Sequence, residues 1–180
     1  MSYRDRHHVI ESNPSTSDLE GRDGTGERAV HIATRNGRRE CLARVLSRGA
    51  DPHSVNDDGY TALHWGCLNG RYDELQLLFE YVCEPDPRDA IDRTPLHYAA
   101  SNGHLDVLRL MIDKRANINA IESKQGDSVL HYAVRNGNAQ AVETLLKHGA
   151  NHRYCNLEGD VRWHMNPRCC SVLDTDAHHH

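Results

Sequence analysis

The chain has 180 residues, of which 38% are hydrophobic and only 6% aromatic, and its formal net charge is −5. This length predicts a single domain, and the acidic balance argues against a general attraction to nucleic acid or to an anionic membrane. No apolar run approaches the ~20 residues that span a bilayer, and the N-terminus lacks the apolar core of a signal peptide.

The terminal segments indicate where the folded domain begins and ends, and the cysteines indicate its cellular compartment. Residues 1–23 are polar and carry no apolar period, so we expect a flexible N-terminal tail. The closing three histidines resemble an affinity-tag remnant, and we treat residues 171–180 as a C-terminal tail. The scattered cysteines predict a reducing compartment, the cytoplasm or the nucleus. They are Cys41, Cys67, Cys83, Cys155, Cys169 and Cys170.

From residue 28 onward the sequence repeats one short pattern at spacings of 33, 33 and 34 residues. In its most regular copy Thr94 can cap a helix, Pro95 suits the first helical turn, and Leu96 begins an apolar stripe. Asn102 with Gly103 then breaks the helix, and a second, longer helical period follows. The four cores, each followed by Asn-Gly, are Arg28-Ala29-Val30-His31, Thr61-Ala62-Leu63-His64, Thr94-Pro95-Leu96-His97 and Ser128-Val129-Leu130-His131.

A period of about 33 residues with a Thr-Pro-Leu-His core resembles the ankyrin repeat. The resemblance covers residues 24–165 and implies an all-α fold, an ankyrin-repeat solenoid of stacked helix-turn-helix units with β-hairpin-like inter-repeat loops. We expect four repeats at about 24–57, 58–90, 91–124 and 125–158, with a degenerate fifth at 159–170. One helix pair cannot bury its own apolar face, so stacking must create a continuous thin core.

The resemblance also accounts for many of the 14 histidines. It implies that the histidine of each core ties one repeat to the next through hydrogen bonds. We therefore interpret this position, together with the helix start in repeat three, as structural. The residues concerned are His31, His64, Thr94, Pro95, His97 and His131.

A competing hypothesis concerns the C-terminus, where Cys155, His164 and Cys169 loosely resemble a zinc site. The usual Cys-x-x-Cys pair is missing, and Cys155 aligns with Val55 and Ile121, so a buried thiol is the simpler interpretation. We therefore predict no metal and no cofactor. The alternative function is a metal-binding or nucleic-acid-binding regulator that uses this cluster and the arginine-rich first repeat.

The sequence contains no nucleophile motif and no phosphate-binding loop, so we expect no enzymatic activity. The resemblance implies non-enzymatic protein–protein binding, as an adaptor or inhibitor or as the interaction part of a larger multidomain chain. We expect a monomer that binds a protein partner, without a membrane and without nucleic acid. From Asp51 to Asp92 ten acids face two arginines, which favours a basic segment in the partner.

In ankyrin repeats the inter-repeat loops, or fingers, and the short first helices line a concave face where partners bind. Tyr60 with Trp65 is the expected aromatic anchor, although Trp65 shares its repeat position with Tyr98 and Tyr132, where rings also pack. Carried over by position, the candidate partner-binding residues are Asp57, Asp58, Tyr60, Trp65, Leu68, Asn69, Ile91, Arg93, Ser101, Asn102, Lys124, Gln125, Asp127 and Arg135.

Repeat two departs most from the pattern. The irregular residues there and in repeat three are Glu74 at a buried position, Val82 and Arg115 in place of cap glycines, and Asp92 in place of a finger glycine. Local departures of this kind often mark function. We therefore interpret the junction between repeats two and three, which carries Glu84 and Asp86, as adapted to a partner.

Overall fold

The computed structural model describes residues 21–81 and 83–157. These residues form eight helices and one isolated antiparallel bridge, between Ile121 and Ser128, so the all-α prediction is confirmed. The helices are α2 (Ala29–Arg35), α3 (Arg39–Ser47), α4 (Ala62–Asn69), α5 (Tyr72–Glu80), α6 (Pro95–Asn102), α7 (Leu105–Asp113), α8 (Val129–Arg135) and α9 (Ala139–Lys147).

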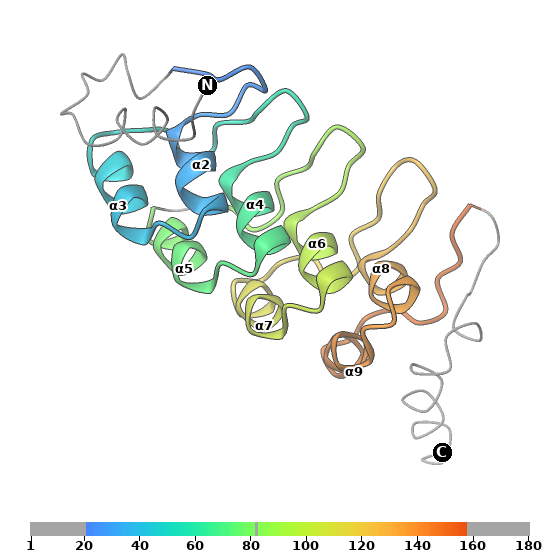
Figure 1. The fold of residues 1–180 in the computed structure, drawn as a ribbon. Helices are drawn as coiled ribbons and strands as arrows, with labels where there is room; N and C mark the ends of the chain where they lie inside the picture. Colours follow the sequence, from blue (N-terminus) through green and yellow to red (C-terminus); the bar gives the residue numbers. More distant parts are fainter. Residues whose placement is uncertain (1–20, 82, 158–180) are drawn as a thin grey trace.

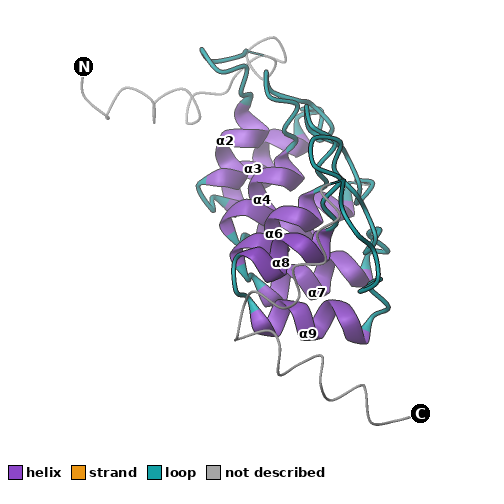
Figure 2. Ribbon diagram, turned by 90° about the vertical axis from the view of Figure 1, so that its right-hand side faces the viewer, coloured by secondary structure: helices purple, strands orange, loops and turns teal. Residues whose placement is uncertain are grey.

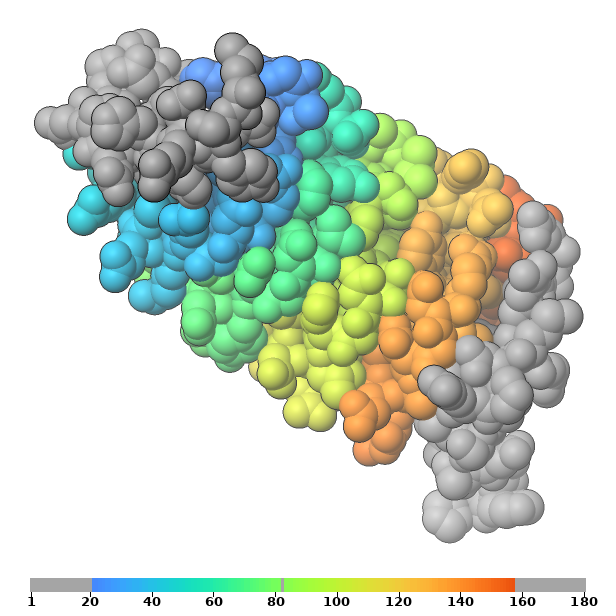
Figure 3. Space-filling view, viewed as in Figure 1, coloured from blue at the N-terminus to red at the C-terminus, as the bar shows by residue number. Residues whose placement is uncertain are grey.

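The helices stack in two parallel rows. The first helices of the pairs, α2, α4, α6 and α8, form one row, and the second helices, α3, α5, α7 and α9, form the other (Figure 1). The connecting fingers gather on one side of the stack, as Figure 2 shows. Figure 3 shows the repeats as successive bands of colour along the molecule. We call the face built by the first helices and the fingers the inner face, and the face built by the second helices the outer face.

Each first helix is short because its own residues start it and stop it. In repeat three, Thr94 is the N-cap and Pro95 is the first residue of α6. Gly103 ends α6 in the left-handed conformation, with φ of 69°, and its N–H donates to the carbonyl of Ala99. The next helix begins two residues later, which folds each pair into a tight hairpin.

The core is a thin layer between the two rows, as the repeat pattern predicts. Leu42, Leu75 and Leu108 occupy one position in successive second helices and are fully buried. At Gly66, where the other repeats carry alanine, a Cβ atom would lie 2.6 Å from the side chain of Leu75. The first helices therefore pack closely enough on their partners to require small residues at this position.

Two irregular residues adopt the conformations of the glycines they replace. Asp92 and Arg115 have φ of 65° and 69°, in the left-handed region that favours glycine. Helix α5 ends at Glu80 with Tyr81 as its C-cap, and Val82 lies outside the described residues. The degenerate fifth repeat predicted at 159–170 also lies outside them.

Candidate protein-binding surface

The predicted partner-binding residues differ widely in exposure. The exposed ones are Asp57, Asp58, Asn69, Asn102, Lys124, Gln125 and Arg135. The half-buried ones are Tyr60, Trp65, Leu68, Ile91, Arg93 and Ser101. Asp127 is fully buried. This set therefore mixes residues that solvent reaches with residues that hold the inner face in place.

The core histidines position the fingers. The backbone N–H of Thr94 donates to Nδ1 of His97 at 3.0 Å, and the N–H of the N-cap residue makes the same bond in the other three repeats. An accepting Nδ1 leaves the hydrogen on Nε2. That Nε2–H donates to the finger that follows the helix pair. His31 reaches the carbonyl of Ser54, in the finger at the end of repeat one, at 2.8 Å, and His64 reaches across the repeat boundary to the carbonyl of Arg93 at 3.1 Å.

Burial keeps these histidine rings neutral. It lowers the pKa of His64 and of His97 to about 4, against the opposing effect of the backbone groups of Arg93 and Asp127. The pKa values of His31 and His131, in the terminal repeats, are also lowered, with burial as the largest cause. The rings therefore act as neutral structural bridges, and not as charged groups that could bind an anion.

A second set of polar side chains accepts hydrogen bonds from the backbone N–H groups of the fingers. None of these side chains was among the candidate site residues predicted from the sequence. Oδ1 of Asp89 accepts the N–H groups of Ile91 and Arg93, at 3.0 and 2.9 Å. Asp23, Asn56 and Glu122 accept two or more finger N–H groups in the same way. The signal was available, because these polar residues recur at spacings of 33 residues.

A buried cluster occupies the centre of the inner face. Oδ2 of Asp89 accepts the Nε–H of Arg93 at 2.8 Å and the hydroxyl of Tyr98 at 2.6 Å. The Tyr98 hydroxyl also lies 2.7 Å from that of Tyr60, in the preceding repeat. Burial raises the pKa of Asp89, but these hydrogen bonds outweigh it and the pKa falls below its usual value. Burial and Asp89 both raise the pKa of Tyr98, so this hydroxyl stays protonated.

A simpler acid–arginine pair lies at each end of the inner face. In repeat one, Arg35 pairs with the buried Glu27 at 2.9 Å, and its guanidinium lies 5.2 Å from the ring centroid of Trp65. In repeat four, Arg135 pairs with Asp127 and lies 5.7 Å from the ring of Tyr132.

The second of these pairs corrects one expectation. Asp127 was predicted to line the binding surface, but its carboxylate is buried beneath Arg135 and accepts a hydrogen bond from Asn156. A buried acid lowers the mobility of the arginine above it. Asp127 therefore positions Arg135 and does not itself reach the surface.

These contacts join into one arginine–aromatic strip, which we define as Arg35, Trp65, Tyr60, Tyr98, Arg93, Tyr132 and Arg135. The Tyr60 ring lies 5.5 Å from those of both Trp65 and Tyr98, in edge contacts. The Arg93 guanidinium lies 4.8 Å from the Tyr98 ring, and the Arg93 side chain also interacts with that of Tyr132 in repeat four. The strip thus crosses all four repeats at the line where the fingers meet the first helices.

The irregular junction combines one exposed acid with one structural acid. The Asp86 carboxylate accepts the backbone N–H of Asn117, at 2.9 and 3.1 Å, and so ties the second finger to the third. Glu84 is exposed and forms no ion pair with another residue in the described part of the chain. Of the two, only Glu84 is free to meet a partner.

The C-terminal zinc hypothesis receives no support within residues 21–81 and 83–157, where no group of His, Cys, Asp and Glu could hold a metal. His164 and Cys169 lie outside these residues. Cys155 is exposed, not buried, and the aligned Val55 is also exposed, so this finger position is not part of the core. Within the same residues, no helix is both long and apolar enough to cross a membrane.

Comparison with known proteins agrees with this architecture. A family model described as "Ankyrin repeats (3 copies)" matches residues 7–89 and 81–154, which together make up most of the chain. A search of curated proteins finds no match. The matched residues include every helix pair described above, and the chain belongs to the ankyrin-repeat family.

Proposed function

We propose that this chain is an adaptor or inhibitor that binds a partner protein through its inner face. Ankyrin repeats are generally protein–protein interaction modules and are typically non-enzymatic. The observation that carries the proposal is the arginine–aromatic strip, because arginine, tyrosine and tryptophan dominate the binding energy of protein interfaces.

The strip is held in place before any partner arrives. The side chains of Arg35, Arg93 and Arg135 are 36%, 23% and 42% exposed, and each is paired with an acid that is almost completely buried. A partner would not have to immobilise these long side chains, which removes part of the entropic cost of binding. The indole N–H of Trp65 is buried and has no acceptor among the described residues, so Trp65 offers its ring to a partner and not its N–H.

The finger tips suggest the charge of the partner. Asp57, Asp58 and Asp92 are exposed, and none forms an ion pair with another described residue. Their charges therefore remain available to a basic segment of the partner, where they would mainly raise the association rate. We place this interaction in the cytoplasm or the nucleus, because the cysteines of the described residues are free.

Site-specific photo-crosslinking tests the proposal. A photoreactive phenylalanine analogue replaces either Asn69 or Arg109. Asn69 is exposed and is the last residue of the first helix α4, and Arg109 is exposed on the outer helix α7. We expect protein adducts from cell lysate with the probe at position 69 and few with the probe at position 109. Adding D57K and D58K to the Asn69 probe should remove them. Equal adduct formation from both positions would contradict binding by the inner face.

A further inference from the structure

The outer face separates opposite charges onto two neighbouring helices. Arg39 and Arg44 are exposed on α3, whereas Asp73 and Glu80 are exposed on α5, which packs beside it. None of these four residues forms an ion pair with another residue in the described part of the chain. The one exposed acid on α3 is Glu40. Within the described part of the chain, the charges of the two helices are thus left unpaired.

The same face exposes two tyrosines, one at each end of α5. Tyr72 is the first residue of the helix and Tyr81 is its C-cap, and they are 38% and 37% exposed. Within the described residues, they are two of the few large apolar side chains left this open. Arginine and tyrosine are both enriched in protein interfaces, and a guanidinium stacks favourably on an aromatic ring.

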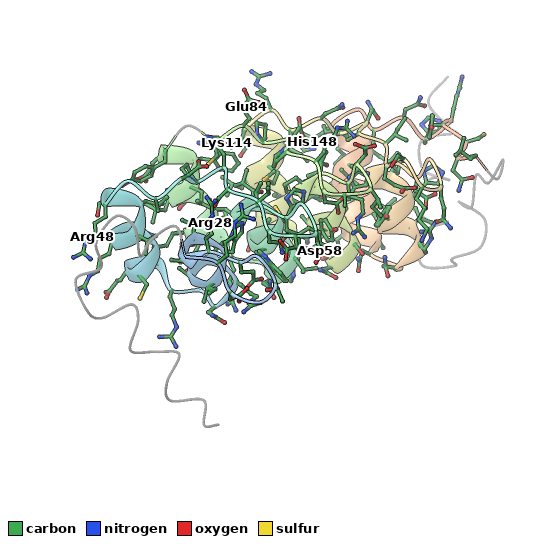
Figure 4. All side chains as sticks on the ribbon, turned by 90° about the horizontal axis from the view of Figure 1, so that it is seen from above. Arg28, Arg48, Asp58, Glu84, Lys114 and His148 are labelled. Atoms are coloured by element: carbon green, nitrogen blue, oxygen red, sulfur yellow. The ribbon has the colours of Figure 1, made fainter. Side chains whose placement is uncertain are left out.

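This separation is confined to the first two repeats. On α7, Asp106 and Asp113 alternate with the exposed Arg109. On α9, Lys147 pairs with Glu143 of its own helix. Figure 4 shows the stack from above, with Arg48 toward one end and Glu84 and Lys114 farther along it. Only the α3–α5 pair therefore presents one positive and one negative helix.

We infer that the α3–α5 face binds the same face of a second copy of this chain. A twofold axis between the two helices places α3 of one copy against α5 of the other, and the reverse, so each positive helix meets a negative one. A dipolar surface of this kind is complementary to itself. It repels a uniformly charged partner over half of its area.

The twofold axis also fixes the register. Successive repeats are translated copies, so α3 and α5 run in the same direction. Only an axis parallel to the two helices places α3 against α5, and it keeps the paired helices parallel. Arg39, at the start of α3, then lies near Tyr72 and Asp73, at the start of α5 in the second copy. Arg44 lies in the C-terminal half of α3, nearer to Glu80 at the end of α5. Each helix is about 13 Å long, so the interface is small, and association is weak and sensitive to salt.

Sedimentation velocity over a wide concentration range measures this association. We expect the full chain to dimerise reversibly at low ionic strength and to dissociate when salt is added. R39E/R44E and, separately, D73K/E80K should each weaken dimerisation at least about tenfold. The matched control is R109E/K147E, which changes the net charge as much as R39E/R44E on α7 and α9 and should leave dimerisation unchanged.

Mixing the two variants distinguishes self-recognition from a nonspecific loss of association. The acidic α3 of the R39E/R44E chain meets the basic α5 of the D73K/E80K chain, and the remaining two helices are also opposite in charge. An equimolar mixture should therefore form heterodimers although each variant alone stays monomeric. A wild-type chain that is monomeric at every concentration, or variants that do not associate on mixing, would overturn the inference. Circular dichroism confirms that each variant is folded.

Discussion

The centre of the inner face and its two ends are built from the same parts, an acid, an arginine and an aromatic ring. At the centre, Asp89 holds both Arg93 and Tyr98, and Tyr98 reaches Tyr60 in the preceding repeat. At the ends, Glu27 and Asp127 each hold one arginine that remains more exposed. The pairs also differ in position within the repeat, because Arg93 lies four residues after its acid, whereas Arg35 and Arg135 each lie eight residues after theirs.

The difference indicates which parts of the surface are rigid. In the middle of the stack, four hydrogen bonds meet on the Asp89 carboxylate, and one of its donors, Tyr98, also contacts Tyr60 of the preceding repeat. Losing any of these bonds leaves a buried polar group unpaired. At the ends the acids are also buried, but the arginines are more exposed, so water can replace the contacts that their guanidinium groups lose. We therefore expect the centre to determine stability and the ends to adapt to a partner, and four predictions test this contrast.

The largest expected effect concerns the core leucines. Leu108→Ala and Leu42→Ala remove equivalent, fully buried side chains, and each should lower the free energy of unfolding by about 2–5 kcal/mol. We expect the larger loss for Leu108→Ala, because α7 packs between α5 and α9 whereas α3 packs against α5 alone among the outer helices. Urea denaturation measures both values. A larger loss at Leu42 would show that the end of the stack is not the softer part.

Acid should destabilise the central repeats through their histidines. His64 and His97 have a pKa of about 4 when folded and about 6.5 when unfolded. The unfolded chain therefore binds protons first, and stability that is complete above pH 6.5 falls as the pH drops toward 4. Each ring should contribute a loss on the order of 3 kcal/mol at the acid limit.

The measurement is the urea midpoint as a function of pH. The slope between pH 6.5 and 4 should be reduced in H97Q and unchanged in H53Q, whose histidine is exposed in the first finger. Equal slopes in wild type and H97Q would show that the buried ring does not govern this pH dependence.

The two types of acid–arginine pair should respond differently to loss of charge. D89N keeps an oxygen for the finger N–H groups but removes the negative charge that holds Arg93 and Tyr98, and should cost about 1–3 kcal/mol. E27Q acts on a pair whose arginine is 36% exposed, and burial already raises the pKa of Glu27, so its cost should stay below about 1 kcal/mol. Thermal denaturation of both variants measures the two losses of stability. Equal shifts in Tm would remove the distinction between centre and ends.

The smallest effect should be a gain in stability. Arg115 has φ of 69°, a conformation that glycine adopts without strain, and its side chain is exposed. R115G should therefore raise the free energy of unfolding by about 0.5–1 kcal/mol. D92G should gain less, because aspartate tolerates the left-handed conformation better. Chemical denaturation of the two variants tests this order.

The fold followed from the sequence because the repeat itself is the structural unit. The helix starts, the glycine turns and the buried leucines recur every 33 residues, so each copy supports the interpretation of the others. The left-handed backbone at Asp92 and Arg115 could also be predicted, since each residue stands where other repeats have glycine. Alignment of four copies made these local constraints visible without any structure.

The inner face was only partly predictable, because burial there depends on contacts between repeats. Position alone suggested that Asp127 lies at the surface, but Arg135 and Asn156 reach it from other elements and cover it. Asp89, the centre of the cluster, was counted only as one of many acids. Its role required knowing that Arg93 and Tyr98 converge on the same carboxylate.

The hydrogen bonds between repeats also give the stack a polarity. The histidines reach forward, from His31 and His64 to carbonyls of the following finger. The residues before the second helices reach backward, from Arg71 to the carbonyl of Arg35 and from His104 to that of Leu68. Truncation from the N-terminal side would therefore release a finger, whereas truncation from the C-terminal side would release the end of a first helix. The two cut surfaces are chemically different, and shortened versions of this protein are not interchangeable.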